Sequence, residues 1–261
     1  MNLKKHVCFV RRLAVTSLAV GLFAGCSTVV EHPDFARRGA GVRHIAVVTP
    51  NVEFHCQAPK SRQVLPDKEA ELRTNLLAAI TRELSAKGFT VAFPEWKALA
   101  TTSNINEALA ASQAIDRAVT RSNFFVSIRF QPPRKRATPE QKEDVRLLGK
   151  LAHADTIAFL QLNGYTNTLA ERDSVGTRNF FGFLFAVSAG AAGPIGATVG
   201  GRGNFEPLHG GIWLQLMLAE AATGEPLWAN AAASTDEHPK LEFIVKELTK
   251  PLPGSRGQPV D

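Results

Sequence analysis

Three segments between residues 42 and 93 decide the fold: VRHIAVVT (42–49), DKEAELRTNLLAAITRELSAKG (67–88) and FTVAF (89–93). The first and third are short, rich in β-branched or aromatic residues and followed by prolines, which is typical of strands. The middle segment predicts a helix that begins at Asp67 as N-cap and ends at Lys87-Gly88. Its apolar residues form one helical stripe: Leu72, Leu76, Leu77, Ile80 and Leu84. The order predicts a β–α–β unit, with a loop through Cys56 and Pro59 before the helix.

Two further helices and a central strand follow. The first helix is expected over 105–121, with Asn104 and Glu107 in capping-box spacing, and a weakly alternating strand over 124–130. Another capping box, at Thr138-Pro139-Glu140-Gln141, opens a helix that we expect to end at Asp155. Its expected buried face is Val145, Leu148, Leu151 and Ala152. The segment 156–162 (TIAFLQL) is apolar on both faces, as a central strand is.

The C-terminal part predicts a hairpin and a closing helix. One strand carries alternating apolar residues over 212–218, the turn is Ala222-Thr223-Gly224-Glu225, and the return strand covers 226–233. The helix is expected over 239–250 and stops at Pro251. Its expected buried residues are Leu241, Ile244, Val245 and Leu248.

Together these elements predict one α/β domain of two or three layers, with a mixed sheet flanked by helices, over residues 42–250. A Gly/Ala-rich hydrophobic insertion covers 180–201. Residues 26–41 are expected to form a tether, and residues 251–261 a disordered tail.

The N-terminus has the pattern of a secretory signal peptide. Residues 1–25 hold four basic side chains and no acidic one, and residues 13–25 are uncharged and mostly apolar. Such a run is short for a membrane span, so it predicts a targeting segment that is removed. An ordinary secretory signal and an uncleaved anchor are the alternatives.

The signal ends in Leu22-Phe23-Ala24-Gly25-Cys26, which resembles the lipobox of bacterial lipoproteins. The resemblance implies signal-peptidase cleavage between Gly25 and Cys26 and acylation of Cys26, which would then hold the chain to a membrane. Ser27 in place of aspartate implies, by the sorting of such lipoproteins, the periplasmic face of the outer membrane.

Charge and composition exclude several classes of protein. The chain has 30 Lys+Arg and 24 Asp+Glu, and loss of the four basic residues of the signal leaves a net charge of +2. This small excess gives no argument for a nucleic-acid partner. We find no nucleophile elbow, phosphate-binding loop or zinc-protease motif, and therefore predict no enzyme, no cofactor and no metal.

Cys56 is the one cysteine left after Cys8 is removed and Cys26 is acylated, so no intramolecular disulfide can form. The thiol is either a buried small hydrophobe, which we favour, or an intermolecular partner. Its neighbour His55 does not make a zinc site, because no further ligands follow at the required spacing.

The uncharged segment 180–201 (FFGFLFAVSAGAAGPIGATVGG) has three interpretations. It is a hydrophobic excursion of the domain, in which glycine disfavours helix; a glycine-zipper contact with a membrane or with other copies of the chain; or a hairpin given to a multimeric barrel. The residues that would make the contact are Phe180, Phe181, Phe183, Phe185, Gly190, Gly193, Gly196 and Gly200.

The loop Arg134-Lys135-Arg136 is basic. It is either a contact for lipid or lipopolysaccharide phosphates or, as we favour, a solvated loop beside the acidic start of the next helix.

Two longer stretches, LGKLAHADTIAFLQLNGY (148–165) and GIWLQLMLAEAATGEPLWANAAAS (211–234), resemble one group of periplasmic lipoproteins. This is the superfamily of the curli-secretion channel and the penicillin-binding-protein activators. The matching positions are Ala154-Asp155, Tyr165, Thr223-Gly224 and Trp228, whereas Ala221 stands where relatives often carry an acid or a small residue. These motifs are structural, so the resemblance implies a fold more than an activity.

The sequence therefore predicts a lipid-anchored, non-enzymatic binding or assembly component of the cell envelope, with a periplasmic or outer-membrane protein as partner. The alternative is a subunit of an oligomeric outer-membrane secretion pore, for which the chain would form a homo-oligomer.

Overall fold

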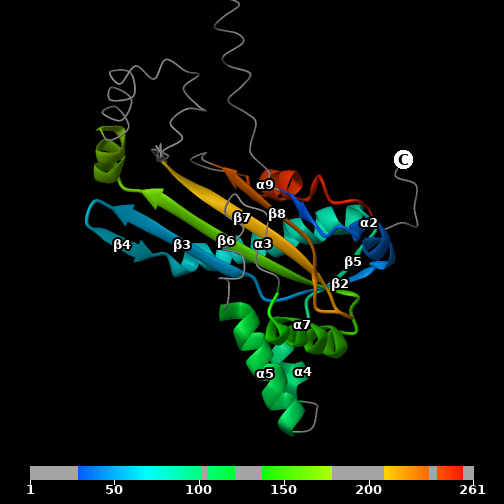
Figure 1. Cartoon of the computed structure of the whole chain (residues 1–261). Coiled ribbons are helices and arrows are strands. Elements are labelled where there is room, and N and C mark those ends of the chain that lie inside the picture. Colours follow the sequence, from blue (N-terminus) through cyan, green and yellow to red (C-terminus); the bar gives the residue numbers. More distant parts are fainter. Residues whose placement is uncertain (1–28, 102–104, 121–136, 178–208, 235–239, 255–261) are drawn as a thin grey trace, which may run out of the picture.

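The computed structural model describes residues 29–101, 105–120, 137–177, 209–234 and 240–254. Within them lies an eight-stranded mixed sheet with the strand order β1-β8-β7-β6-β2-β5, to which β3 and β4 are joined through β6 (Figure 1). The strands are β1 (Val30–Glu31), β2 (His44–Val47), β3 (Asn51–Ala58), β4 (Ser61–Val64), β5 (Thr90–Ala92), β6 (Thr156–Asn167), β7 (Gly210–Glu220) and β8 (Pro226–Ser234).

The predicted β–α–β unit is confirmed. Strands β2 and β5 pair in parallel, with Ile45 opposite Val91, and α3 (Pro66–Ala86) connects them. The N-cap is Leu65 and not Asp67, because Pro66 occupies the first turn, where its fixed φ suits a helix and its missing N–H costs no bond. The predicted stop is confirmed, since Gly88 follows the helix with φ +85°.

The prediction of a loop through Cys56 and Pro59 is wrong. Residues 51–64 form an antiparallel hairpin of β3 and β4, in which His55 lies opposite Val64, and β3 also pairs in parallel with β6. The hairpin escaped prediction because β3 alternates over only two apolar residues, Val52 and Phe54, and β4 is exposed at every position.

The capping box of α7 (Pro139–Ala152) is confirmed: the Gln141 amide donates to Thr138 Oγ1 at 3.2 Å, and the Thr138 amide donates to Gln141 Oε1 at 2.8 Å. The helix ends at His153, which has the left-handed φ of 48°, and not at Asp155. The Asp155 carboxylate instead accepts hydrogen bonds from the backbone amides of Arg43 and His44, at 3.0 and 2.9 Å. It thereby ties the start of β2 to the start of β6.

Strand β6 is central, as predicted, because it pairs with β2, β3 and β7. The hairpin of β7 and β8 is confirmed, and so is the closing helix α9 (Leu241–Thr249) with its four expected buried residues. Helix α5 (Ile105–Thr120) matches the prediction for 105–121, whereas Asn104 and the strand expected over 124–130 lie outside the described residues.

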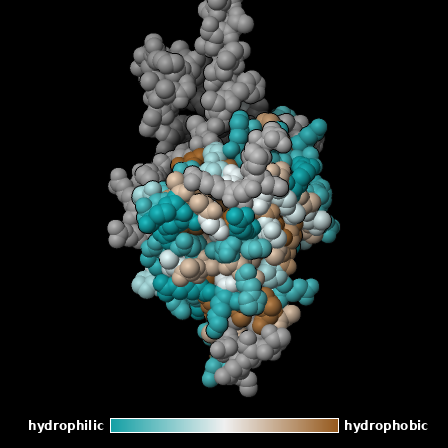
Figure 2. Space-filling view, turned by 90° about the vertical axis from the view of Figure 1, so that its right-hand side faces the viewer, coloured by the Kyte–Doolittle hydropathy of each residue, from teal (hydrophilic) through white to brown (hydrophobic). Residues whose placement is uncertain are grey.

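The sheet lies between two helical layers, so the predicted α/β domain has three layers. One face packs against α3 and α9, and its buried side chains include Ile45, Leu160 and Leu214. The other face packs against α4 (Trp96–Thr101), α5 and α7, and its buried side chains include Ile157 and Met217 (Figure 1). Figure 2 shows one side of the molecule as mainly hydrophilic, with hydrophobic residues in small groups, as expected of an ordinary protein surface.

The prediction of a tether over residues 26–41 is wrong for most of this segment. The chain forms β1 on the edge of β8, then α2 (Phe35–Arg38) and a 3-10 turn (Gly39–Gly41). Phe35 is buried in the core, and Val29 packs against the same cluster of side chains. Burial of these apolar side chains stabilises the packing of this segment against the domain, although the segment is polar in composition.

The prediction of a disordered tail from Pro251 is wrong for its first residues. Leu252 is buried, and its carbonyl accepts a hydrogen bond from Lys87 Nζ at 2.8 Å. The rest of the predicted tail, from residue 255, lies outside the described residues. Among the helices of the described part, none has both the length and the apolar character needed to span a bilayer.

Candidate functional site

The contact residues predicted from the sequence lie outside the described residues. This holds for the cleavage and acylation positions, for the basic loop and for the hydrophobic insertion. They are Gly25, Cys26, Arg134, Lys135, Arg136, Phe180, Phe181, Phe183, Phe185, Gly190, Gly193, Gly196 and Gly200. Their roles stay predictions.

The positions that carry the family resemblance are described, and each has a structural contact. Asp155 binds the two backbone amides at the start of β2, and Trp228 is buried within the sheet. Tyr165 stacks on His55, with ring centroids 5.8 Å apart. Gly224 has φ +73°, and a Cβ there would lie 2.2 Å from the Lys142 carbonyl oxygen, so this turn requires glycine.

Five side chains at the β7–β8 turn form an ion-paired group that we name the Arg38 cluster: Arg38, Lys142, Glu220, Thr223 and Glu225. The Arg38 guanidinium donates to Glu220, to Glu225 Oε2 at 2.8 Å and to Thr223 Oγ1 at 2.7 Å. Lys142 Nζ, from α7, donates to Glu225 Oε1 at 2.9 Å. The cluster joins the N-terminal segment, the hairpin turn and α7 across more than 180 positions of sequence.

The cluster is ionised over a wide pH range. Hydrogen bonds from Arg38 and then from Lys142 lower the pKa of Glu225 from 4.5 to about 2. The Arg38 hydrogen bond likewise lowers the pKa of Glu220, and bonding to Glu220 raises the pKa of Arg38. Because the folded carboxylates bind protons less readily than the unfolded chain, their contribution to stability is present above pH 4.5 and is lost as the pH falls toward about 2.

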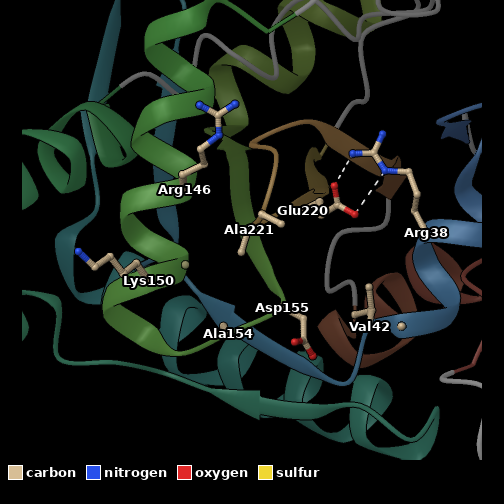
Figure 3. A pocket seen from close by; sticks show the side chains of 11 residues that line it. Arg38, Val42, Arg146, Lys150, Ala154, Asp155, Glu220 and Ala221 are labelled. Atoms are coloured by element: carbon tan, nitrogen blue, oxygen red, sulfur yellow. Dashed lines mark hydrogen bonds and ion pairs between the residues drawn. The ribbon is translucent and has the colours of Figure 1, made fainter.

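Beside the Arg38 cluster lies a pocket of about 560 Å³, between α7, the start of β2 and the end of β7 (Figure 3). Arg146 and Lys150 of α7 lie on one side of it, and Arg38 with Glu220 on the other. The floor between them is made of small residues, among them Gly149 and Ala221. A Cβ at Gly149 would lie 2.3 Å from that of Ala221, so α7 approaches β7 closely here.

The charged groups of the pocket are largely engaged in the fold. Glu220 pairs with Arg38, Asp155 binds backbone amides, and Arg146 pairs with Glu143 at 2.8 Å. The described lining contains no serine, cysteine or histidine.

A second polar region lies on the sheet face that packs against α7. It lies farther along the strands than the apolar side chains that contact this helix. Asn51, Gln161 and Gln215 stand in register on β3, β6 and β7, and we name them the polar row. Gln161 and Gln215 are buried. Farther along the same face, burial lowers the pKa of His55, and the positive charge of Arg62 lowers it further.

Within the described ranges, no group of three or more His, Cys, Asp or Glu side chains is placed to hold a metal ion. Cys56 is a free, half-buried thiol on β3, so it is not the fully buried residue that we favoured.

The Arg38 cluster was missed by sequence reasoning. Arg38 lies in a segment that reads as a tether, and its partners Glu220 and Glu225 lie in a turn whose Thr-Gly pair gives the only local signal. Ion pairs between distant positions leave no periodicity in a single sequence.

Comparison with known proteins gives little further information. No model of a protein family matches the chain, and no curated protein matches its sequence. Among solved structures, the chain is similar to the LpoB C-terminal domain from Salmonella enterica, with 11% identity over 75% of this chain and 87% of that one, at a TM-score of 0.25. At that identity and TM-score the similarity carries no argument about family, activity or partner.

Proposed function

We propose that the protein is a lipoprotein of the bacterial cell envelope, held to the periplasmic face of the outer membrane by acyl chains on Cys26. Its domain binds a periplasmic or membrane protein and has no enzymatic activity. Confinement to the membrane raises the effective concentration of such a partner without any added contact.

The observation that carries the proposal is the sequence Leu22-Phe23-Ala24-Gly25-Cys26 at the end of an uncharged apolar run that follows four basic residues. Cys26 is followed by strand β1 only four positions later, at Val30. Since an extended chain covers at most about 3.6 Å per residue, the two residues are no more than ~14 Å apart. An acylated Cys26 would therefore hold the folded domain close to the bilayer.

A binding role fits the described residues better than catalysis. Both carboxylate oxygens of Glu220 accept hydrogen bonds from Arg38, and Oδ2 of Asp155 accepts from two backbone amides, so both acids have a structural role. The three-layer domain is a rigid scaffold that presents its loops and outer helix faces to other molecules.

The test is cell fractionation and intact mass of the full-length protein beside Cys26→Ala, each with and without residues 180–201. We expect the wild type to carry acyl chains and to fractionate with the outer membrane. We expect Cys26→Ala to carry no acyl chains and to be lost from the outer-membrane fraction, whether or not residues 180–201 are present.

Two other outcomes would contradict the proposal. A wild-type mass without acyl chains would exclude the anchor. If Cys26→Ala stays in the membrane until residues 180–201 are also removed, and the detergent-solubilised particle has a large symmetric mass, then the pore subunit is the better description.

A further inference from the structure

The outer face of α9 combines an exposed aromatic ring with lysine side chains. Phe243 is 65% exposed, although large apolar side chains usually lie inside. Lys246, Glu247 and Lys250 follow at the i+3, i+4 and i+7 positions, so they lie on the same stripe of the helix, and Lys240 precedes it as N-cap.

This exposure is not caused by a loosely held helix. The opposite face of α9 buries Leu241, Ile244, Val245 and Leu248 in the main core. In addition, Asn230 Nδ2 of β8 donates to the Leu248 carbonyl at 2.6 Å. The inner face of α9 is thus packed and hydrogen-bonded, and this holds the Phe243 ring on the outer surface.

The charge of this face is positive. Glu242 pairs with Arg82 of α3, at 3.2 Å, and Glu247 pairs with Lys250, at 3.7 Å. Three lysines and Arg82 stand against these two acids, so the face has a net positive charge. Phenylalanine among lysines is the composition of surfaces that lie at the headgroup level of anionic membranes.

The same face lies beside the point where the chain leads to Cys26. Strand β1 forms the edge of the sheet beside β8, and α9 packs on the face of the sheet over β8, so both elements contact this strand. Val29 packs against the core cluster to which the buried side of α9 belongs. Three residues of extended chain span at most ~11 Å, so an acylated Cys26 lies no farther than this from Val29, at the same edge of the sheet.

We infer that α9 is the membrane-contacting element of the domain, with the Phe243 ring among the headgroups of anionic phospholipids and Lys246 and Lys250 on their phosphates. The inference rests on the proposed acylation of Cys26, and it sets the orientation of the anchored domain. The face opposite α9, which carries α5 and α7, then points into the periplasm and is available to a protein partner.

The experiment uses the acylated full-length protein reconstituted into vesicles of phosphatidylcholine and phosphatidylglycerol that carry brominated acyl chains. The probe is Phe243→Trp, and the matched control is Leu109→Trp. Leu109 is 58% exposed on α5, on the other side of the sheet, so both variants place a new indole on an exposed helix. The three native tryptophans contribute equally to both.

We expect the added emission of Phe243→Trp to shift to the blue and to be quenched by the brominated lipid, and that of Leu109→Trp to stay unquenched. Lys246→Glu with Lys250→Glu, added to Phe243→Trp, should reduce the quenching, and the reduction should disappear in vesicles without phosphatidylglycerol.

Equal emission of the two tryptophan variants in an acylated protein would contradict the proposed orientation of α9. It would not contradict the lipid anchor. A chain whose intact mass shows no acyl group would overturn the anchor and the orientation together.

Discussion

Two adjacent residues of β6 lie at the same depth on opposite faces of the sheet. Leu162 is fully buried between Val52 and Leu214, under the layer of α3 and α9. Gln161 is 4% exposed and stands between Asn51 and Gln215 in the polar row. One face is thus a continuous apolar core, whereas the other changes along the same strands from apolar residues to amides.

The difference between Leu162 and Gln161 shows that a buried side chain does not always stabilise the fold. Removing Leu162 from water is favourable in itself, because its surface is apolar. Gln161 has a buried Oε1 atom for which the described residues provide no hydrogen-bond partner, and desolvation of such an atom is unfavourable. The apolar face therefore supplies stability, and the unpaired oxygen of Gln161 reduces it.

The largest expected effect is that of Leu162→Ala. The substitution opens a cavity at a fully buried site, and we expect the free energy of unfolding to fall by about 2–5 kcal/mol. The measurement is equilibrium unfolding in urea of the full chain carrying Cys26→Ala. Leu109→Ala, on the exposed face of α5, serves as the control and should change the value by no more than about 0.5 kcal/mol. If Leu162→Ala lowers the free energy of unfolding no more than Leu109→Ala does, then Leu162 is not buried under α3 and α9.

Gln161→Met tests the neighbouring position and should have the opposite sign. Methionine has a similar length and no carbonyl to desolvate, so we expect the free energy of unfolding to rise by about 1 kcal/mol. The same urea titration measures it, and the slope with denaturant should be unchanged. A clear loss of stability would show that the Gln161 side-chain amide is hydrogen-bonded in the folded protein.

The same difference explains which parts of the fold are predictable from the sequence. The β–α–β unit, the β7–β8 hairpin and α9 have apolar residues at helical or alternating spacing, and this spacing directly records burial on one face. The β3–β4 hairpin has too little of this spacing, because β3 offers only Val52 and Phe54 and every residue of β4 is exposed.

The functional elements divide in the same way. The proposed anchor at Cys26 is a local pattern of consecutive residues, so it is visible in the sequence. The Arg38 cluster depends on contacts between Arg38 and Glu220, which are 182 positions apart, and the outward position of Phe243 depends on how α9 docks on the sheet. Both require the tertiary structure.

The smallest expected effect concerns His55, on the same face as Gln161. Burial lowers its pKa below the ordinary value of 6.5, and Arg62 lowers it further, while Glu53 and Glu69 act in the opposite direction. The unfolded chain therefore binds a proton at this site more readily than the folded chain, so wild-type stability decreases as the pH falls below 6.5.

His55→Phe keeps a ring to stack on Tyr165 and removes the titrating group. The stability of His55→Phe relative to the wild type should rise as the pH falls from about 7.5 toward about 5, because only the wild type has to bind a proton at this site. The check is the free energy of unfolding of both proteins across this range. If the two pH profiles run parallel, His55 is as easily protonated in the fold as in the unfolded chain, and this end of the sheet face is open to water in a way that Gln161 is not.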